Sequence, residues 1–376
     1  MKKILVIYGS VGLGHKVIAE NIAHALEKQG VQVVKLDALQ LYQGTLTSVS
    51  TKVYSFIIRY VPRIWGFLYT NRFFQSLSLP LRIPFARLKA NKFRNFVETQ
   101  KPDLILTTHP TATALALAMK SMKVFSGPVV TTFSDYHFQP FWVYKGVSHY
   151  LVMTEEQKGE ILERGFGKNQ ITITGLPVDQ SFLQRYDRAA VLKEFQLSGA
   201  PLVLVMGGSR SWGIKKTDLE AILGLTSKFQ VAVLVGLNPE FRESLKKIQD
   251  REGGRFQVFG DLTQVAVAKL FSVAMVLVTK PGGLTIAQAV ESALPMILVN
   301  PLPTMEEMNE EFLLSHGAAV SAKTSSKLAA ALEKFLRDKV YYQSVKASLE
   351  KLRSPEAANI AAKTILEVLE SLTAKK

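Results

Sequence analysis

Short apolar runs alternate with helix-length segments along the chain, and this pattern occurs twice. The first half contains the strand-like runs KILVIYG, LILTTHP, PVVTTFSD and HYLVM, and the second half contains PLVLVMGGS, QVAVLVG, AMVLVTKPGG and PMILVN. Successive strands separated by a helix pair in parallel, because the crossover returns the chain to the same end of the sheet. The sequence therefore predicts an α/β protein with two Rossmann-like, doubly wound domains.

Length and composition also favour two domains. With 376 residues and 47% hydrophobic side chains, the chain exceeds an ordinary single domain and can fill two cores. We expect a first domain at 1–178, a second at 200–353, and a C-terminal helix at 354–376 that packs back on the first domain. The segment from about 177 to 200 is the expected linker.

The N-terminus and the absence of cysteine indicate the kind of compartment in which the protein works. MKKILVIYGS has a basic start, but its apolar run is short and leads into a glycine motif, so it predicts a strand rather than a signal peptide. No run approaches the ~20 apolar residues that a membrane-spanning helix needs. Without cysteine no disulfide can form, which fits a reducing compartment. We expect a soluble or peripheral protein.

One segment makes the protein basic. Residues 38–97 contain no Asp or Glu, nine of the basic side chains and twelve of the aromatic ones, within a net charge of +15. Cations mixed with aromatic and aliphatic side chains are typical of a surface that binds anionic lipid headgroups, so we predict membrane contact here. We expect Trp65 of this segment to contact a lipid that accepts a transferred group. An apolar core with a solvated cationic face is the alternative. Nucleic acid is not expected, because the aromatics are interleaved with aliphatic residues.

The run GSVGLGHKV follows the first strand and opens a helix, as loops that bind phosphate or sugar do. It fails as a dinucleotide fingerprint because Val17 occupies the third glycine position, and it lacks the Lys and Ser/Thr of a Walker motif. His15, beside Gly14, lies where the helix dipole favours a neutral imidazole, which could take a proton from an acceptor hydroxyl. A structural, hydrogen-bonded histidine is the alternative interpretation.

The stretch KPGGLTIAQAVESALPMILVNPLPTMEEMN at 280–309 combines a glycine turn, a helix start near Thr285 and a polar cluster between two strands. The unpaired N–H groups of a helix start can bind a diphosphate, and Gly282 and Gly283 let the backbone approach it. The stretch predicts a nucleotide-sugar pocket. An ordinary strand-to-helix turn, which needs only one glycine, is the alternative.

Taken in order, these motifs resemble those of a known family. GSVGLGHKVIAENIAHAL, THP, SDYHFQPFW, GLPVDQSF, MGGS and the 280–309 stretch look like the monogalactosyldiacylglycerol synthase and processive diacylglycerol glucosyltransferase family, over roughly residues 1–320. The chain is more distantly similar to the lipid I N-acetylglucosaminyltransferase. The resemblance implies a GT-B fold, with two Rossmann-like domains facing a central cleft. It also implies an inverting transfer of a hexose from a UDP-sugar to a membrane lipid, and the lipid that we expect is diacylglycerol.

On the acceptor side, the resemblance implies roles for residues of the first domain. His15 matches the proposed base of the family, and Asp135 matches the aspartate that would orient the base or the acceptor. His109, His137 and Gly14 would line the acceptor site. A capping or ion-paired role for Asp135 and a structural role for His109 stay open.

On the donor side, the resemblance implies a second set of contacts. The turns that would hold the diphosphate contain Gly207, Gly208, Ser209, Gly282, Gly283, Leu284 and Thr285. Glu306 and Asn309 would contact sugar hydroxyls, although in isolation they would be an exposed helix start. The uracil would lie near Phe259.

Four positions depart from the family pattern. Gln288 replaces the glutamate expected to bind the ribose, and as a neutral partner it should bind less strongly. Ala293 replaces a glycine, Met305 a glutamine and Gln139 a histidine, for which His137 is a possible substitute. These changes leave the donor sugar undetermined and keep a non-catalytic homologue open.

The sequence predicts no metal and no cofactor besides the donor. No Asp-x-Asp occurs, and the histidines are not spaced as ligands, so helix N-termini would stabilise the leaving diphosphate. We expect a cytoplasmic, peripheral glycolipid transferase on the inner face of the plasma membrane. The alternatives are a transferase of the same fold that acts on a polyprenyl-linked acceptor such as lipid I, and a non-catalytic protein that binds membrane or nucleic acid.

Overall fold

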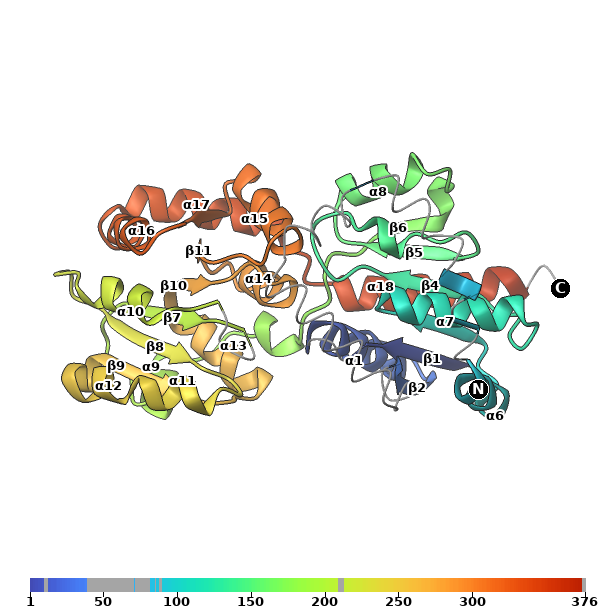
Figure 1. Ribbon diagram of the computed structural model, residues 1–376, viewed down its shortest axis with the longest axis horizontal. Coiled ribbons are helices and arrows are strands. Elements are labelled where there is room, and N and C mark those ends of the chain that lie inside the picture. Colours follow the sequence, from blue (N-terminus) through green and yellow to red (C-terminus); the bar gives the residue numbers. More distant parts are fainter. Residues whose placement is uncertain are drawn as a thin grey trace. The chain divides into compact units, whose positions relative to one another are not determined.

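The chain folds into two compact units. The computed structural model describes residues 1–9, 13–38, 71, 82–84, 86–87, 90–208 and 213–373. One unit comprises Met1–Pro177 together with Glu356–Lys376, and the other comprises Val178–Pro355. Each unit contains a parallel sheet covered by helices (Figure 1).

The first unit contains a six-stranded sheet in the order β2-β1-β3-β4-β5-β6. Neighbouring strands of this sheet run parallel to each other. The strands are β1 (Lys3–Tyr8), β2 (Gln32–Asp37), β3 (Leu104–Thr107), β4 (Val129–Thr132), β5 (His149–Val152) and β6 (Ile171–Ile173). Ile4, Leu5, Val6 and Ile7 are all buried in the middle of this sheet, which explains the unbroken apolar run of the sequence.

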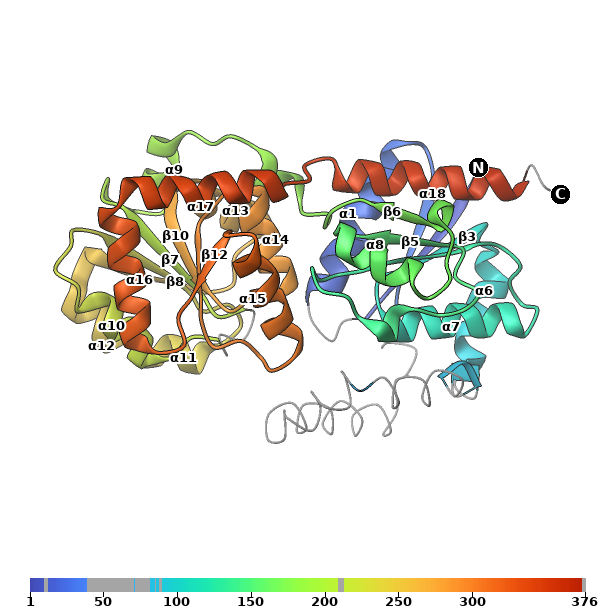
Figure 2. The same cartoon turned by 90° about the horizontal axis from the view of Figure 1, so that it is seen from above.

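The helices of the first unit include one from the far end of the chain. They are α1 (Leu13–Lys28), α6 (Asn91–Gln100), α7 (Pro110–Ser121), α8 (Glu155–Leu162) and α18 (Ala357–Thr373), with the short η1 (Pro140–Trp142) and η2 (Lys168–Gln170). Helix α18 lies beside α1 (Figure 2). Ala361, Ala362 and Ile365 of this helix are fully buried.

The second unit contains another six-stranded sheet, in the order β12-β11-β10-β7-β8-β9. Its neighbouring strands are again parallel. The strands are β7 (Leu202–Met206), β8 (Gln230–Leu234), β9 (Phe256–Phe259), β10 (Ala274–Thr279), β11 (Met296–Leu298) and β12 (Ala319–Ser321). Read from β9 to β12, this order is that of the dinucleotide-binding fold. The predicted pair of Rossmann-like parallel sheets is confirmed.

The helices of the second unit surround its sheet. They are α9 (Arg188–Glu194), α10 (Lys216–Leu223), α11 (Pro239–Ser244), α12 (Lys246–Glu252), α13 (Gln264–Val273), α14 (Gly283–Glu291), α15 (Met305–Ser315), α16 (Ser325–Arg337) and α17 (Lys339–Leu352), with η3 (Gln180–Leu183) and η4 (Gly253–Arg255). The expected linker at 177–200 contains η3 and α9, which pack on α13. Arg188 also donates a hydrogen bond to the carbonyl of Val273 at 2.9 Å, so this segment is part of the second unit.

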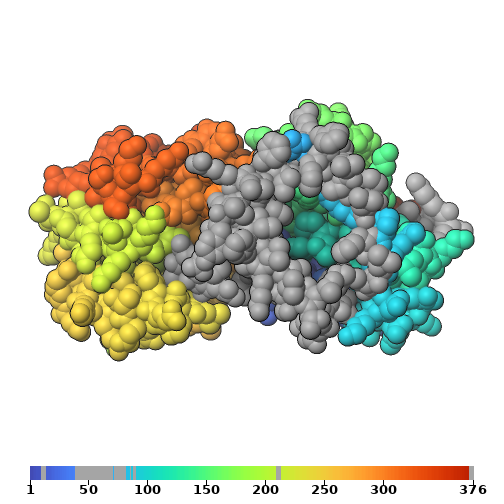
Figure 3. All heavy atoms as spheres, viewed as in Figure 1, coloured from blue at the N-terminus to red at the C-terminus, as the bar shows by residue number. Residues whose placement is uncertain are grey.

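Most of the basic segment at 38–97, including Trp65, lies outside the described residues. Its C-terminal part enters α6, on the surface of the first unit (Figure 3). There Phe93 and Val97 are buried, while Lys92 and Arg94 are exposed. On this helix the aromatic side chain belongs to the core and the cations face solvent, which is the alternative that the sequence left open.

Candidate functional site

The strand order reverses at one point in each sheet. In the first sheet β1 lies between β2 and β3, and in the second sheet β7 lies between β8 and β10. Ligands of open α/β sheets bind at the carboxyl ends of the strands beside such a reversal. His15 and His109 follow β1 and β3, and Gly208 and Lys280 follow β7 and β10. Each unit therefore carries candidate residues at the expected edge of its own sheet.

In the first unit, two histidines and a tryptophan meet at this edge. The ring of His15, in the first turn of α1, lies perpendicular to the ring of His109 with 4.9 Å between centroids. Trp142 of η1 lies 5.7 Å from the His15 ring. The carbonyl of His15 accepts a hydrogen bond from Thr108 Oγ1 at 3.0 Å, which ties the start of α1 to the end of β3. The fold thus joins residues that are 93 positions apart.

The surroundings of His15 favour its neutral form. Burial lowers the pKa of the imidazole, while the charge of Asp135 and a backbone hydrogen bond at Thr108 oppose this with smaller effects. Nδ1 of His15 is buried and has no hydrogen-bond partner among the described residues. A neutral imidazole can accept a proton, as the predicted base must.

His109 is suited to donate a hydrogen bond rather than to accept a proton. It caps the N-terminus of α7, where its Nδ1 accepts the N–H of Thr111 at 3.2 Å. The proton of the neutral ring is therefore on Nε2. Burial, with a contribution from His15, lowers the pKa of His109 to about 3. Gly9 allows this packing, since a Cβ there would lie 3.0 Å from Cγ of His109.

A short hydrogen-bond chain holds Asp135. Its Oδ2 accepts from Ser134 Oγ at 3.0 Å and from Gln139 Nε2 at 2.8 Å. The indole Nε1 of Trp142 donates to Oε1 of Gln139. Because an indole N–H can only donate, this bond turns the amide nitrogen of Gln139 toward the carboxylate. Gln139, a departure from the family pattern, thus links Asp135 to Trp142.

Gln157 fixes the backbone of the same loop, and the sequence analysis did not single it out. Its Nε2 donates to the carbonyls of Asp135 at 2.6 Å and His137 at 2.8 Å, and its Oε1 accepts the N–H of Met153 at 2.8 Å. No motif marks a glutamine in the first turn of α8 for this task. His137 is buried in this loop and Gly14 lies beside His15, but their predicted contacts with an acceptor stay predictions.

In the second unit, the two predicted glycine turns lie next to each other. Gly207 and Gly208 follow β7, and Gly208 has a positive φ of 79°, which suits glycine. Ser209 lies outside the described residues. Gly282 precedes α14 and supplies no side-chain cap. Gly282 therefore offers no side-chain acceptor to the N–H groups in the first turn of α14, which belong to Gly283, Leu284 and Thr285.

A buried ion pair adjoins these turns, and its cation was not predicted. Nζ of Lys280 contacts Oε1 of Glu306, and Oε2 of Glu306 accepts the N–H of Leu302 at 2.8 Å. Asn309, fully buried on the next turn of α15, donates to the carbonyl of Pro281 at 3.1 Å. The polar cluster of the sequence therefore fixes the turn before α14. Its contact with sugar hydroxyls stays a prediction.

The two remaining donor-side residues lie further from the turns. Gln288 is 3% exposed, and its Nε2 donates to Oε1 of Gln264 on α13 at 2.7 Å. The ring of Phe259 packs edge-on against Phe195 with 5.6 Å between centroids. The predicted contacts of Gln288 with ribose and of Phe259 with uracil stay predictions. Ala293 has a positive φ of 46°, which explains why a glycine is favoured at that position.

Two further properties concern the described residues alone. Among them, no three His, Asp or Glu side chains are grouped so that they could hold a metal ion. None of the helices in these parts of the chain combines the length and the apolar character needed to cross a bilayer.

Solved structures define the class of fold. The chain superposes with a TM-score of 0.65 on MnaA of S. aureus in complex with UDP, at 14% identity, over 100% of this chain and 97% of that one. It superposes with a TM-score of 0.63 on MurG of Acinetobacter baumannii, at 16% identity, over 98% of this chain and 100% of that one. The protein has the GT-B fold.

Sequence comparisons indicate the family. The family model of monogalactosyldiacylglycerol (MGDG) synthase matches the sequence at residues 15–178. Processive diacylglycerol beta-glucosyltransferase of Bacillus cytotoxicus is 25% identical over 369 residues, which cover 97% of this chain and 93% of the relative. The resemblance drawn from the motifs is confirmed: the chain is similar to the MGDG synthase family and to the processive diacylglycerol beta-glucosyltransferases.

Proposed function

We propose that this protein is an inverting glycosyltransferase that moves a hexose from a UDP-sugar to diacylglycerol in a membrane. The observation that carries the proposal is His15 at the reversal point of the first sheet, with a buried Nδ1 and a pKa that burial lowers against the smaller opposing effect of Asp135. The named relatives are diacylglycerol glucosyltransferases, which supports a glycolipid reaction. The UDP in a structural neighbour supports a UDP-linked donor.

The proposed reaction is a single displacement. His15 takes the proton of the acceptor hydroxyl while the hydroxyl oxygen bonds to the anomeric carbon. The bond from that carbon to the diphosphate breaks, and UDP leaves with its electron pair through an oxocarbenium-like transition state. Asp135 stabilises the imidazolium that forms, and Nε2–H of His109 can donate a hydrogen bond to the acceptor. Gly14 and His137 complete the acceptor side of the proposal.

The donor side of the proposal lies in the second unit. The turns at Gly207–Ser209 and Gly282–Thr285 bind the diphosphate, and the N-terminus of α14 stabilises its charge without a metal or a further cofactor. Gln288 binds the ribose and Phe259 lies near the uracil. Glu306 and Asn309 bind sugar hydroxyls.

The basic segment completes the proposed function. Residues 38–97, with Trp65 among them, bind the anionic inner face of the plasma membrane from the cytoplasm. Each Lys or Arg near such a surface contributes about 1 kcal/mol, so the nine basic residues are enough for reversible binding. Binding should therefore weaken as salt rises.

The test is UDP release from UDP-glucose, UDP-galactose and UDP-N-acetylglucosamine, with liposomes that contain diacylglycerol and anionic lipid. We expect one donor to give lipid-dependent release, and His15→Ala to lower the rate by about 10²–10⁴. His24→Ala is the matched control, because His24 is an exposed histidine on the same helix, and its rate should equal that of wild type. Release with lipid I alone would support the polyprenyl-linked acceptor. Liposome binding without release from any donor would support a non-catalytic protein.

A further inference from the structure

Lys280 lies between the two glycine turns of the second unit. Strands β7 and β10 are neighbours, so the turns that follow them meet at one edge of the sheet. A Cβ on Gly208 would lie 2.9 Å from Cε of Lys280, and a Cβ on Gly213 would lie 2.8 Å from its Cβ. On the other side, Nζ is 3.9 Å from the position of a Cβ on Gly282. Glycine at 208 and 213 therefore leaves the room that the lysine side chain fills, and a Cβ on Gly282 would lie at ordinary contact distance from its ammonium.

The ammonium of Lys280 is paired with Glu306 in this arrangement. The two side chains are only 18% and 10% exposed. Removing two charges from water is costly, and a buried pair often contributes little net stability compared with apolar residues of the same size. A cation is also unfavourable beside the N-terminus of α14, whose dipole is positive there. The site therefore concentrates positive charge, which the carboxylate of Glu306 balances.

We propose that Lys280 binds the diphosphate of the nucleotide sugar, and that Glu306 is the counter-ion that holds the ammonium between the turns beforehand. This inference rests on the proposed glycosyl transfer and adds a residue to its donor site. An ammonium has three N–H donors, so Lys280 can keep one on Glu306 while it donates the others to phosphate oxygens. The same charge stabilises the diphosphate when it leaves with the electron pair of the broken bond.

The test is calorimetric binding of UDP and of uridine to the full chain. Lys280→Met should weaken UDP binding by about 10- to 100-fold, the usual effect of one hydrogen bond to a charged group, and should leave uridine binding unchanged. Glu306→Gln should instead strengthen UDP binding, because the amide oxygen of glutamine can still accept from Lys280 while the negative charge that repels the diphosphate is removed. A residue that only stabilised the fold would not give these opposite effects. Lys246→Met is the control, since Lys246 is 63% exposed in an ion pair with Glu243, and its UDP affinity should equal that of wild type.

Lys280→Met leaves Glu306 buried without its cation and can therefore unfold the protein. The double variant Lys280→Met/Glu306→Gln removes both charges and keeps the test valid. It should bind uridine as wild type does, and UDP about as weakly as Lys280→Met does. Equal UDP affinity in the double variant and wild type would overturn the role of Lys280 and leave glycosyl transfer standing. Failure of wild type to bind UDP would overturn both proposals.

Discussion

His15 is kept neutral by burial, and its charge balance depends on Asp135. Burial lowers the pKa of the imidazole, and the carboxylate raises it by less. The carboxylate is in turn fixed by Ser134 and Gln139. At neutral pH a histidine with a lowered pKa is already in its neutral form and can accept a proton directly.

We predict the pH dependence of catalysis from this balance. The neutral form of His15 is the active one, so kcat/KM should fall as pH decreases through a pKa below the ordinary value of 6.5. Asp135→Asn removes the charge that raises this pKa, so the acid limb should move to lower pH, together with a lower maximal rate. Rates of UDP release between about pH 4.5 and 8.5, chosen as about two units on either side of 6.5, measure both effects. An acid limb above pH 6.5, or a shift to higher pH in Asp135→Asn, would contradict the assignment of His15 as the base.

Single residues also show where sequence reasoning reaches its limit. His15 was predicted from the glycine loop that precedes it, because a loop at a strand end is a local pattern. Lys280 was not predicted, although it begins the stretch that drew most attention. Its importance depends on the backbone of Gly208 and Gly213 and on a carboxylate of α15. Such neighbours are set by the fold and not by spacing along the chain.

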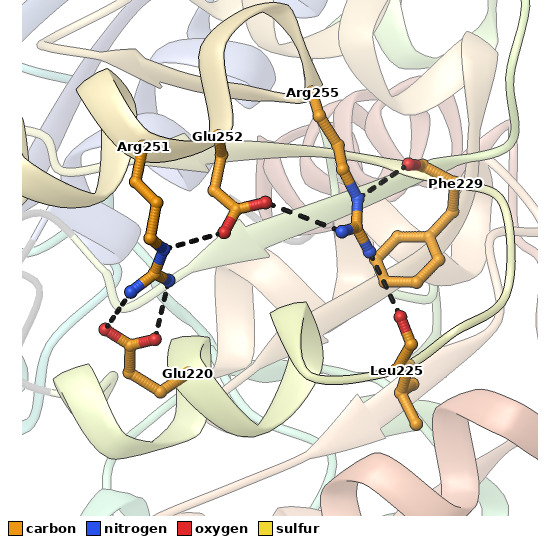
Figure 4. A network of polar contacts seen from close by, with 6 residues as sticks. All are labelled: Glu220, Leu225, Phe229, Arg251, Glu252 and Arg255. Carbon is orange, nitrogen blue, oxygen red and sulfur yellow. Dashed lines mark hydrogen bonds and ion pairs between the residues drawn. The ribbon is translucent and has the colours of Figure 1, made fainter.

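Among the elements, the end of α12 is joined to its surroundings by two arginines (Figure 4). Arg251 binds Glu220 of α10 and the adjacent Glu252. Arg255 donates to the carbonyls of Phe229 and Leu225, both at 3.3 Å, and its guanidinium lies 4.6 Å from the Phe229 ring centroid. The first arginine pairs with side chains near the surface, whereas the second satisfies the backbone before β8.

We predict different effects for the two arginines on stability. Arg255→Ala should lower the free energy of unfolding by about 1–2 kcal/mol, because it removes the donors of two backbone carbonyls and a cation–π contact. Arg251→Ala is the matched control and should change stability little, because its side chain is 53% exposed and its pairs are screened by water. The urea midpoint measures both effects. A larger loss in Arg251→Ala would show that the surface pairs dominate.

The elements themselves were largely predictable. Strands of a parallel sheet are buried on both faces, so they appear in the sequence as continuous apolar runs. The segment at 177–200 was expected to be a linker between the two domains. Phe182 and Val191 are in fact buried in the second unit, and only their packing on α13 reveals it.

At the scale of the whole molecule, the chain ends in the unit where it began. Helix α18 follows the second unit but packs on α1, and Lys2 pairs with Glu370 at 2.7 Å. The first unit therefore depends on residues from both ends of the sequence. A destabilising substitution in α18 should therefore lower the stability of the first unit and not that of the second unit, which directly precedes the helix in the sequence.

We predict that Ile365→Ala destabilises the first unit alone. Ile365 is completely buried, and its truncation should cost about 2–5 kcal/mol. Ile360→Ala is the matched control on the same helix, since Ile360 is 39% exposed, and its effect should be small. Hydrogen exchange followed by mass spectrometry should become faster in α1 and stay unchanged in β7 and β10. Equal acceleration in both units would show that they unfold together.

The ordered motifs of the sequence indicated the GT-B class through their resemblance to a known family. The sequence by itself also determined the two parallel sheets and the strand ends that carry His15 and the glycine turns. These properties follow from local periodicity and from turn chemistry, which the chain encodes over a few residues. The tertiary structure decided the rest: the contact of His15 with His109, the orientation of Gln139 by Trp142, and the position of Lys280 beside Glu306. These contacts depend on which strands become neighbours and on which polar groups are buried together. The spacing of residues along the chain specifies neither.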